Sequence, residues 1–313
     1  MRAKTLGRRR RIRRYWPLLA MMVPGLLYLL INNYLPLFGL VIAFKDINYS
    51  EGIIKGILNG PWVGMKNFEF LFRSQDAWII TRNTILYNLV FIVLNTAAAI
   101  ALAICMKEVA SRFFSRFFQS VLLFPNFISM VIVSYLVYAF LSTDAGFLNK
   151  GVLPLFGADP IQWYTSPQYW PFILVFVNLW KNVGMLSIVY FAALVGIDPQ
   201  YYEAATLDGA GRWRQTRSIT LPMISPVIIM MVLLSVGRMF YSDFGLFYQV
   251  PMDSGLLYDV TGTIDTYVFR SLIKLGDVGM ASAAGVYQSV VGFVLVLASN
   301  WLVRKIDRDS ALF

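Results

Sequence analysis

The chain has 313 residues, of which 58% are hydrophobic and 14% charged, and its formal charge is +10. So few polar residues cannot cover the surface of one or two soluble domains, and the composition therefore predicts an integral membrane protein. The chain has no histidine and one cysteine, which excludes histidine acid–base chemistry, a Ser-His-Asp triad, a Cys/His zinc site and an intrachain disulfide.

Six apolar runs are long enough to cross a hydrocarbon core of about 30 Å. None of them contains an acidic residue, and all are too long and continuous for the alternating strands of a β-barrel. The fold class that this predicts is an all-α membrane protein, a bundle of six transmembrane helices. The predicted spans cover about 17–44, 83–106, 117–141, 170–196, 222–240 and 280–303.

The first run follows the arginine-rich segment 8–14, as the apolar part of a signal peptide would. Its apolar part is longer than that of a signal peptide and lacks an obvious small-x-small cleavage site, so we interpret it as a retained helix. Residues 1–16 are then a cytoplasmic basic tail, and residues 17–313 form the six-span domain.

The basic residues indicate the orientation. Segments 1–16, 107–116, 197–221 and 304–313 hold 17 Lys and Arg in 61 residues, whereas the three intervening segments hold 8 in 105. Because positive charge is enriched on the cytoplasmic side of membrane proteins, both termini are expected there. The basic excess is thereby explained by the lipid bilayer, and no nucleic-acid partner is expected.

The segment 197–221, between the fourth and fifth spans, predicts two short helices joined by a turn. Asp198 before Pro199 is typical of a helix start, and Gly209 and Gly211 are typical of its end. A second short helix is expected over 212–219. On these residues alone the segment could be an amphipathic interfacial loop or a projection that contacts another protein.

Two cations lie inside the predicted spans, Lys181 in the fourth and Arg238 in the fifth. A charge in hydrocarbon costs at least a few kcal/mol, so both should face the bundle interior, a partner or a watery cavity. Each could bind a substrate. Alternatively, each could be held by the carboxylate of Asp243 or by carbonyls at a helix end.

Amide and aromatic side chains near these cations have the chemistry that binds sugar hydroxyls and sugar rings. A uronate carboxylate would also account for the cations. Any single aromatic residue could instead pack between helices, and Asn95 and Asn126 are expected to hydrogen-bond between helices. The candidate substrate-binding residues are Asn178, Lys181, Asn182, Arg238, Tyr241, Asp243, Tyr248, Gln249 and Gln288.

The loop carries a recognisable motif. Glu203-Ala204-Ala205, Asp208-Gly209-Ala210 and Ile219-x-Leu221-Pro222 resemble the EAA loop of bacterial ABC importer permeases. The resemblance implies the type I ABC importer permease fold, in which 197–221 is a coupling loop that docks on an ATP-binding subunit. Thr216 and Arg217 stand where relatives usually carry aromatic residues. The residues implied in coupling are Glu203, Ala204, Ala205, Asp208, Gly209, Ala210 and Gly211.

Three further segments, 32–45, 62–72 and 243–251, resemble the LplB-type branch of the maltose-type carbohydrate permeases. This resemblance implies a permease subunit, in a bacterial cytoplasmic membrane, of an ATP-driven importer of oligosaccharides. The sugar is neutral or carries uronates, and the substrate contacts come from the fourth to sixth spans. A peptide or amino-acid importer and an ion-driven transporter are the alternatives, although inverted repeats and buried acids, frequent in the latter, are not seen.

The resemblance also implies the partners: a second permease subunit in a heterodimer, two ATP-binding subunits and an extracytoplasmic solute-binding protein. The chain lacks the G-x-x-x-x-G-K-[ST] motif that cradles phosphates, so ATP hydrolysis is expected on the separate subunits. We therefore expect no enzyme activity, metal site or cofactor in this chain, with ATP and Mg bound by the partner ATPase subunits.

Overall fold

The computed structural model describes residues 2–47, 53–109 and 111–306. The described part is helical, and its single β-type pairing is an antiparallel bridge between Lys45 and Trp62. The α-helices are α1 (Arg2–Leu29), α2 (Ile53–Asn59), α3 (Glu69–Arg73), α4 (Gln75–Lys107), α5 (Arg112–Phe127), α6 (Met130–Leu141), α7 (Trp170–Val195), α8 (Gln200–Leu207), α9 (Arg212–Gln215), α10 (Leu221–Gly237), α11 (Tyr258–Thr261), α12 (Ile264–Ile273) and α13 (Val278–Ile306).

Among the described residues, five helices are long and apolar enough to cross a membrane. They cover Tyr15–Phe44, Gln75–Lys107, Pro167–Val195, Arg212–Gly237 and Val278–Lys305. Turns of π- and 3-10 helix at Leu30–Tyr34 and Leu35–Phe44 extend α1 to the end of the first of these. The prediction of an all-α membrane bundle is confirmed.

The third predicted span, 117–141, is not one straight helix. Phe113–Phe127 and Met130–Leu141 meet at an angle of 94°. Pro125 lies near the end of α5, and the Ser129 hydroxyl accepts a 3.4 Å hydrogen bond from the Ile132 N–H to begin α6. A proline that cannot donate and a serine that caps the next helix together break the apolar run.

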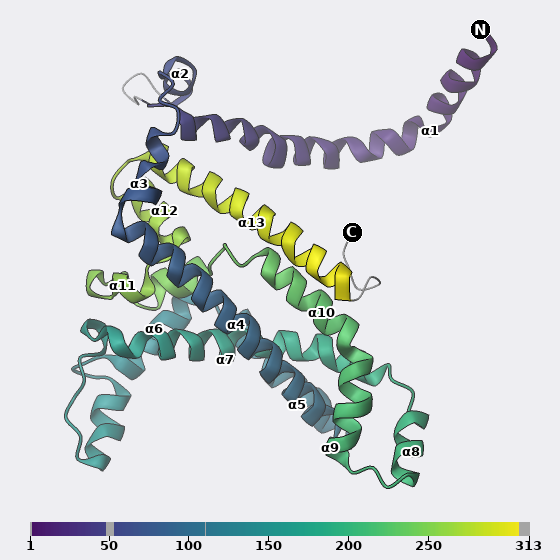
Figure 1. Cartoon of the computed structure of the whole chain (residues 1–313), viewed down its shortest axis with the longest axis vertical. Coiled ribbons are helices and arrows are strands. Elements are labelled where there is room, and N and C mark those ends of the chain that lie inside the picture. The colour runs from purple at the N-terminus through teal and green to yellow at the C-terminus, as the bar shows by residue number, and fades with distance from the viewer. Residues whose placement is uncertain (1, 48–52, 110, 307–313) are drawn as a thin grey trace.

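The helices α4 and α7 cross and pack together more extensively than any other pair in the described chain (Figure 1). Buried residues that include Tyr87, Phe91, Trp170 and Leu174 form one part of the core between them. On another side of α7, Gly184 allows close contact with α5, because a Cβ there would lie 1.8 Å from the Leu122 carbonyl oxygen.

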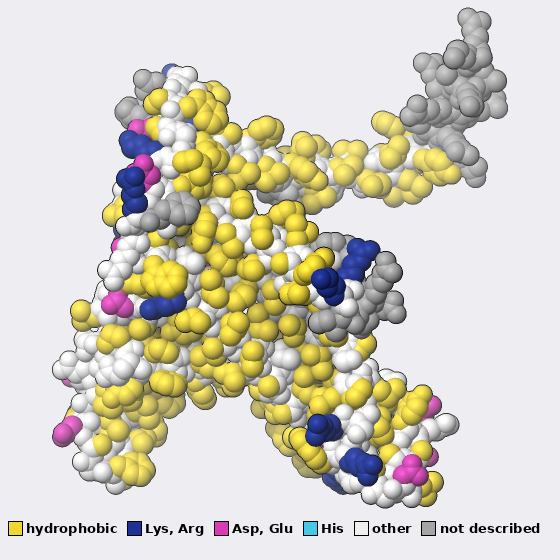
Figure 2. All heavy atoms as spheres, viewed as in Figure 1, with side chains coloured by type: hydrophobic (Ala, Val, Ile, Leu, Met, Phe, Trp, Pro, Cys, Tyr) yellow, Lys and Arg dark blue, Asp and Glu magenta, His cyan; other side chains and the backbone are white. Residues whose placement is uncertain are grey.

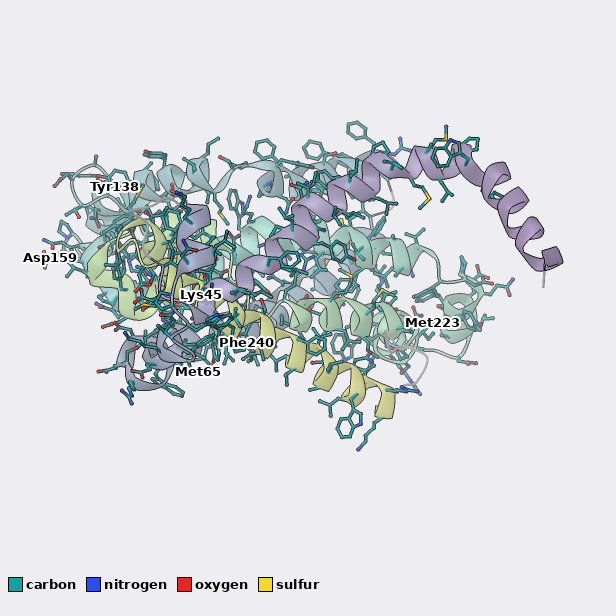
Figure 3. The ribbon with its side chains drawn as sticks, turned by 90° about the horizontal axis from the view of Figure 1, so that it is seen from above. Lys45, Met65, Tyr138, Asp159, Met223 and Phe240 are labelled. Carbon is teal, nitrogen blue, oxygen red and sulfur yellow. The ribbon has the colours of Figure 1, made fainter. Side chains whose placement is uncertain are left out.

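The bundle has two ends. Figure 1 shows α8, α9 and the C-terminal end of α13 toward one end, which we call the α8 end, and α2, α3, α11 and α12 at the other, the α12 end. In Figure 3, Met223 lies toward the first, and Lys45, Met65 and Asp159 lie at the second. In the face shown in Figure 2, hydrophobic side chains cover the middle, and most charged ones lie toward the ends. This distribution fits a membrane-crossing bundle.

The helix α1 projects away from the rest of the chain (Figure 1). In the most apolar part of the segment Tyr15–Phe44, 6% of the residues are buried. Only its last part, Leu35–Phe44, packs closely on another membrane helix, α13. Most of the apolar surface of α1 is therefore not covered by the rest of the described chain.

Candidate functional site

The loop between α7 and α10 forms two helical arms joined by a tight turn. The Asp198 carboxylate accepts a 2.9 Å hydrogen bond from the Gln200 N–H at the start of α8. Gly209 has φ +76°, the left-handed conformation that glycine adopts without strain. The Ala210 N–H returns to the Ala205 carbonyl at 2.8 Å, which closes the turn.

The second arm differs from the prediction. The expected separate helix over 212–219 is a single turn of α9, a π-helical turn at Thr216–Thr220, and then α10. These pieces form one continuous membrane-crossing helix, Arg212–Gly237. Pro222 lies in the first turn of α10, where a missing N–H is tolerated, so it does not end the helix.

Hydrogen bonds tie the first arm to this long helix. The Gln215 amide donates to the Thr206 hydroxyl and to the Ala210 carbonyl, each at 2.9 Å. The Tyr202 hydroxyl lies 3.0 Å from the Thr220 hydroxyl. These hydrogen bonds therefore join α8 directly to the helix that crosses the membrane.

The end of α4 contacts both arms. The Lys107 ammonium lies 3.7 Å from the centroid of the Tyr202 ring, and Arg212 forms an exposed ion pair with Glu108. An exposed pair of this kind contributes little stability, about 0–1 kcal/mol. The cation–ring contact adds a second tie between α4 and the loop.

The tip of the loop is exposed. Of the residues implied in coupling, Ala205 and Ala210 are half-buried and the other five are exposed. Leu207 and Trp213, on either side of the turn, are 90% and 78% exposed. Sequence reasoning missed these two, although apolar residues flanking a predicted exposed turn were a usable signal. Large apolar side chains exposed together often mark a contact surface.

Lys181 is held by backbone carbonyls. Its ammonium donates to the carbonyls of Pro125, Asn126 and Ile128 at 3.3, 3.2 and 2.5 Å, and the residue is 9% exposed. These carbonyls belong to the end of α5 and the residue that follows it. Of the two alternatives for Lys181, the geometry favours the helix-end carbonyls over a substrate.

The amides beside Lys181 join α4 to α7. The Asn95 side chain donates to the Asn178 side-chain oxygen at 2.8 Å, and Asn182 donates to the Asn178 carbonyl at 3.0 Å. The expected interhelical hydrogen bond of Asn95 is therefore confirmed. Asn178 is buried, and Asn182 is half-buried.

Arg238 differs from Lys181 in its surroundings. It follows the last residue of α10, its side chain is exposed, and it makes no ion pair within the described part of the chain. The Asp243 carboxylate instead accepts a 3.1 Å hydrogen bond from the Leu246 N–H. Tyr241 is 46% exposed, and its hydroxyl lies 3.3 Å from the Ser289 hydroxyl. The structure thus places Arg238, Tyr241 and Asp243, all three exposed, on the segment that follows α10.

The remaining candidates are more enclosed. The Tyr248 ring stacks on Phe244, with centroids 4.9 Å apart, and both Tyr248 and Gln249 are half-buried. Gln288 is 5% exposed, and its amide nitrogen donates to the Phe240 carbonyl and lies 3.2 Å from each carboxylate oxygen of Asp265. Sequence reasoning missed Asp265, because it lies in a segment outside the predicted spans.

Comparison with known proteins identifies the family. Residues 95–308 match the family described as binding-protein-dependent transport system inner membrane component. The chain belongs to this family. Its members are permease subunits of ABC importers and are not enzymes themselves, because ATP is hydrolysed on separate subunits.

Several relatives cover nearly the whole chain. The polygalacturonan/rhamnogalacturonan transport system permease protein YteP of Bacillus subtilis is 33% identical, over 93% of this chain and 88% of that protein. Protein LplB of the same organism is 34% identical, over 93% of this chain and 89% of that protein. The resemblance to the LplB-type branch is confirmed.

A solved structure agrees with the fold. A chain of a bacterial ABC transporter involved in the import of the acidic polysaccharide alginate superposes with a TM-score of 0.86 at 33% identity. The match covers 95% of this chain and 98% of that chain. The type I permease fold expected from the loop motif is therefore confirmed.

Proposed function

We propose that this chain is the transmembrane permease subunit of an ABC importer for acidic, uronate-containing oligosaccharides. The observation that carries the proposal is the exposed guanidinium of Arg238, which forms no ion pair within the described residues and lies at the end of a membrane helix, three positions before Tyr241. A guanidinium binds a carboxylate through two parallel hydrogen bonds, and a phenol ring packs against a sugar ring. The names of YteP and of the alginate transporter support an acidic polysaccharide as substrate.

The loop 197–221 is proposed to dock on an ATP-binding subunit through the exposed tip around Glu203, Asp208 and Gly209. Its hydrogen bonds to the fifth membrane helix support this role, since they would pass movement of the docked subunit to the bundle. The implied assembly has a second permease, two ATP-binding subunits holding ATP and Mg, and an extracytoplasmic solute-binding protein. Both termini, with the basic tail 1–16, would then lie in the cytoplasm, and residues 17–313 form the permease domain.

The test is ATPase activity of the complex reconstituted in liposomes, stimulated by the binding protein loaded with a neutral or a uronate-containing oligosaccharide. Stimulation by the acidic sugar should fall at least about tenfold in Arg238→Gln, as expected for loss of a charge-assisted contact of about 1.4 kcal/mol. The control is Arg73→Gln, because Arg73 is exposed and its ion pair is with Glu69, one helical turn away. Stimulation by neutral sugar alone would contradict the acidic substrate, and stimulation by neither would favour a peptide importer.

A further inference from the structure

The segment that carries Arg238 and Tyr241 has no regular secondary structure of its own. It leaves α10 through turns in which the Arg238 N–H donates to the Ser235 carbonyl at 3.1 Å and the Tyr241 N–H to the Arg238 carbonyl at 2.9 Å. Two exposed side chains on such a segment keep a fixed direction only if other parts of the chain hydrogen-bond to the backbone next to them.

Two side chains from distant parts of the sequence form hydrogen bonds to this backbone. The Asp265 carboxylate accepts a 2.6 Å hydrogen bond from the Ser242 N–H. The Gln288 amide nitrogen donates to the Phe240 carbonyl and lies 3.2 Å from each oxygen of the same carboxylate. Hydrogen bonds therefore fix the backbone at residues 240 and 242, on both sides of Tyr241. Figure 3 shows Phe240 close to α13, the helix that carries Gln288.

The start of α12, where Asp265 lies, is fixed by hydrogen bonds. Asp265 lies in the first turn of α12, which opens with a capping box between Thr263 and Thr266. The Ile264 N–H donates to the Thr84 hydroxyl of α4 at 3.1 Å, and these two residues, Thr263 and Thr266 are all buried. The start of α12 is thus fixed to the longest helix of the bundle, so the position of Asp265 is fixed with it.

The surroundings of Asp265 are unfavourable for a charged carboxylate. It forms no ion pair within the described residues, and burial raises the pKa of its carboxyl while the hydrogen bonds from Ser242 and Gln288 lower it. A half-buried acid without a cation costs free energy that its hydrogen bonds must offset. What this acid uniquely supplies is two acceptor oxygens, one for the Ser242 N–H and both within reach of Gln288.

We propose that Asp265 and Gln288 are positioning residues that hold residues 240–242 and thereby direct Arg238 and Tyr241 toward the substrate. The inference rests on the proposed function, since it assumes that these two side chains contact the sugar. It assigns no substrate contact to Asp265 or Gln288. It also reassigns Gln288, whose buried amide is committed to Phe240 and Asp265.

The positional test uses thiol labelling in the full complex. Cys105 is the one cysteine of the chain, so Cys105→Ser makes this subunit cysteine-free, and the label that Tyr241→Cys adds to this subunit reports on the segment. Asp265→Asn replaces one acceptor oxygen with an N–H₂ that faces another donor. We expect the labelling rate by a membrane-impermeant maleimide to change at least about threefold in Asp265→Asn. Asp259→Asn, an exposed acid at the same end, is the control and should leave the rate unchanged.

The functional test uses the same substitution with Tyr241 intact. Asp265→Asn should lower the preference for uronate over neutral oligosaccharide in stimulated ATPase activity about tenfold, while Asp259→Asn leaves it unchanged. Should Asp265→Asn fail to assemble, Gln288→Met removes the donor at similar volume and should give the same two changes. Unchanged labelling and unchanged preference in an assembled variant would overturn the inference.

The two proposals fail separately. If Arg238→Gln keeps its preference for uronate, the proposed contact of Arg238 with the substrate is wrong, and the labelling rate still decides whether Asp265 holds the segment. If Arg238→Gln loses the preference but Asp265→Asn changes neither readout, the positioning inference alone is wrong.

Discussion

The ammonium of Lys181, in the middle of α7, donates a 2.5 Å hydrogen bond to the carbonyl of Ile128, just beyond the end of α5. Two further carbonyls of α5 lie within 3.3 Å of the same nitrogen. The carbonyl end of a helix carries partial negative charge, so a buried cation is stabilised there. Lys181, on the neighbouring helix α7, therefore binds the carbonyls at the break between α5 and α6 and stabilises them.

Replacing Lys181 with methionine should destabilise the bundle. Buried carbonyls that lose their donor cost about 1–3 kcal/mol each, so a loss of several kcal/mol in the free energy of unfolding is expected. Thermal unfolding of the purified complex in detergent measures it. Arg238→Met is the matched control, because that cation is exposed, and its unfolding temperature should stay within a degree or two of the parent. Equal unfolding temperatures for both variants would show that the carbonyls find other donors.

Gly184→Ala should damage the contact between α7 and α5. The new Cβ would lie 1.8 Å from the Leu122 carbonyl oxygen, and backbone atoms cannot move aside as a flexible side chain can. Overpacking of this kind typically costs about 1–3 kcal/mol or more. Gly285→Ala in α13 is the control, since nothing lies within 4 Å of its added Cβ. If both alanines unfold at the parent temperature, the close contact is not important for stability.

Gly209→Val should uncouple ATP hydrolysis from transport. Gly209 has φ +76°, where a β-branched residue is strained by about 1–3 kcal/mol, so the turn at the tip of the loop should rearrange. Substrate uptake per ATP hydrolysed in liposomes measures the effect and should fall severalfold. Gly157→Val imposes similar strain at φ +66°, in a position far from the loop in the sequence, and should keep the parent ratio. An unchanged ratio in Gly209→Val would refute the assignment of the coupling loop.

Leu207→Ser should weaken binding of the ATP-binding subunits. Leu207 is 90% exposed at the end of α8, and burying a leucine side chain contributes about 1.5–3 kcal/mol, or roughly tenfold to a hundredfold in affinity. Affinity measured by titrating the purified ATP-binding subunits onto the permease pair reports the loss. Leu155→Ser changes a leucine that is 81% exposed outside the loop and should bind like the parent. Equal affinities would show that Leu207 is not part of the contact.

Much of the fold could be predicted from the sequence because hydrophobic length is a direct physical requirement of a bilayer. The break at Phe127–Met130 could not be read from hydropathy, since the residues on both sides are equally apolar. Ser129 after Pro125 was the available signal, because a serine that can cap a helix within an apolar run marks a possible new start.

The candidate site was less predictable because charge alone does not show what a side chain contacts. Lys181 and Arg238 look alike in the sequence, yet Lys181 donates to three carbonyls, whereas Arg238 is exposed and forms no ion pair with any described residue. Asp265 acts on Ser242 across 23 positions, and Gln288 acts on Phe240 across 48. Contacts over such separations depend on how the chain folds back, which local sequence patterns do not report.

The length of the projecting first helix predicts that this protein is sensitive to the thickness of its membrane. Tyr15–Phe44 has 30 residues, which at about 1.5 Å per residue exceed a hydrocarbon core of about 30 Å. Only its last part is fixed by packing on α13, so mismatch with the lipid is relieved at the other end, by tilting. We therefore expect the angle at which this helix leaves the bundle to change with the acyl-chain length of the surrounding lipid.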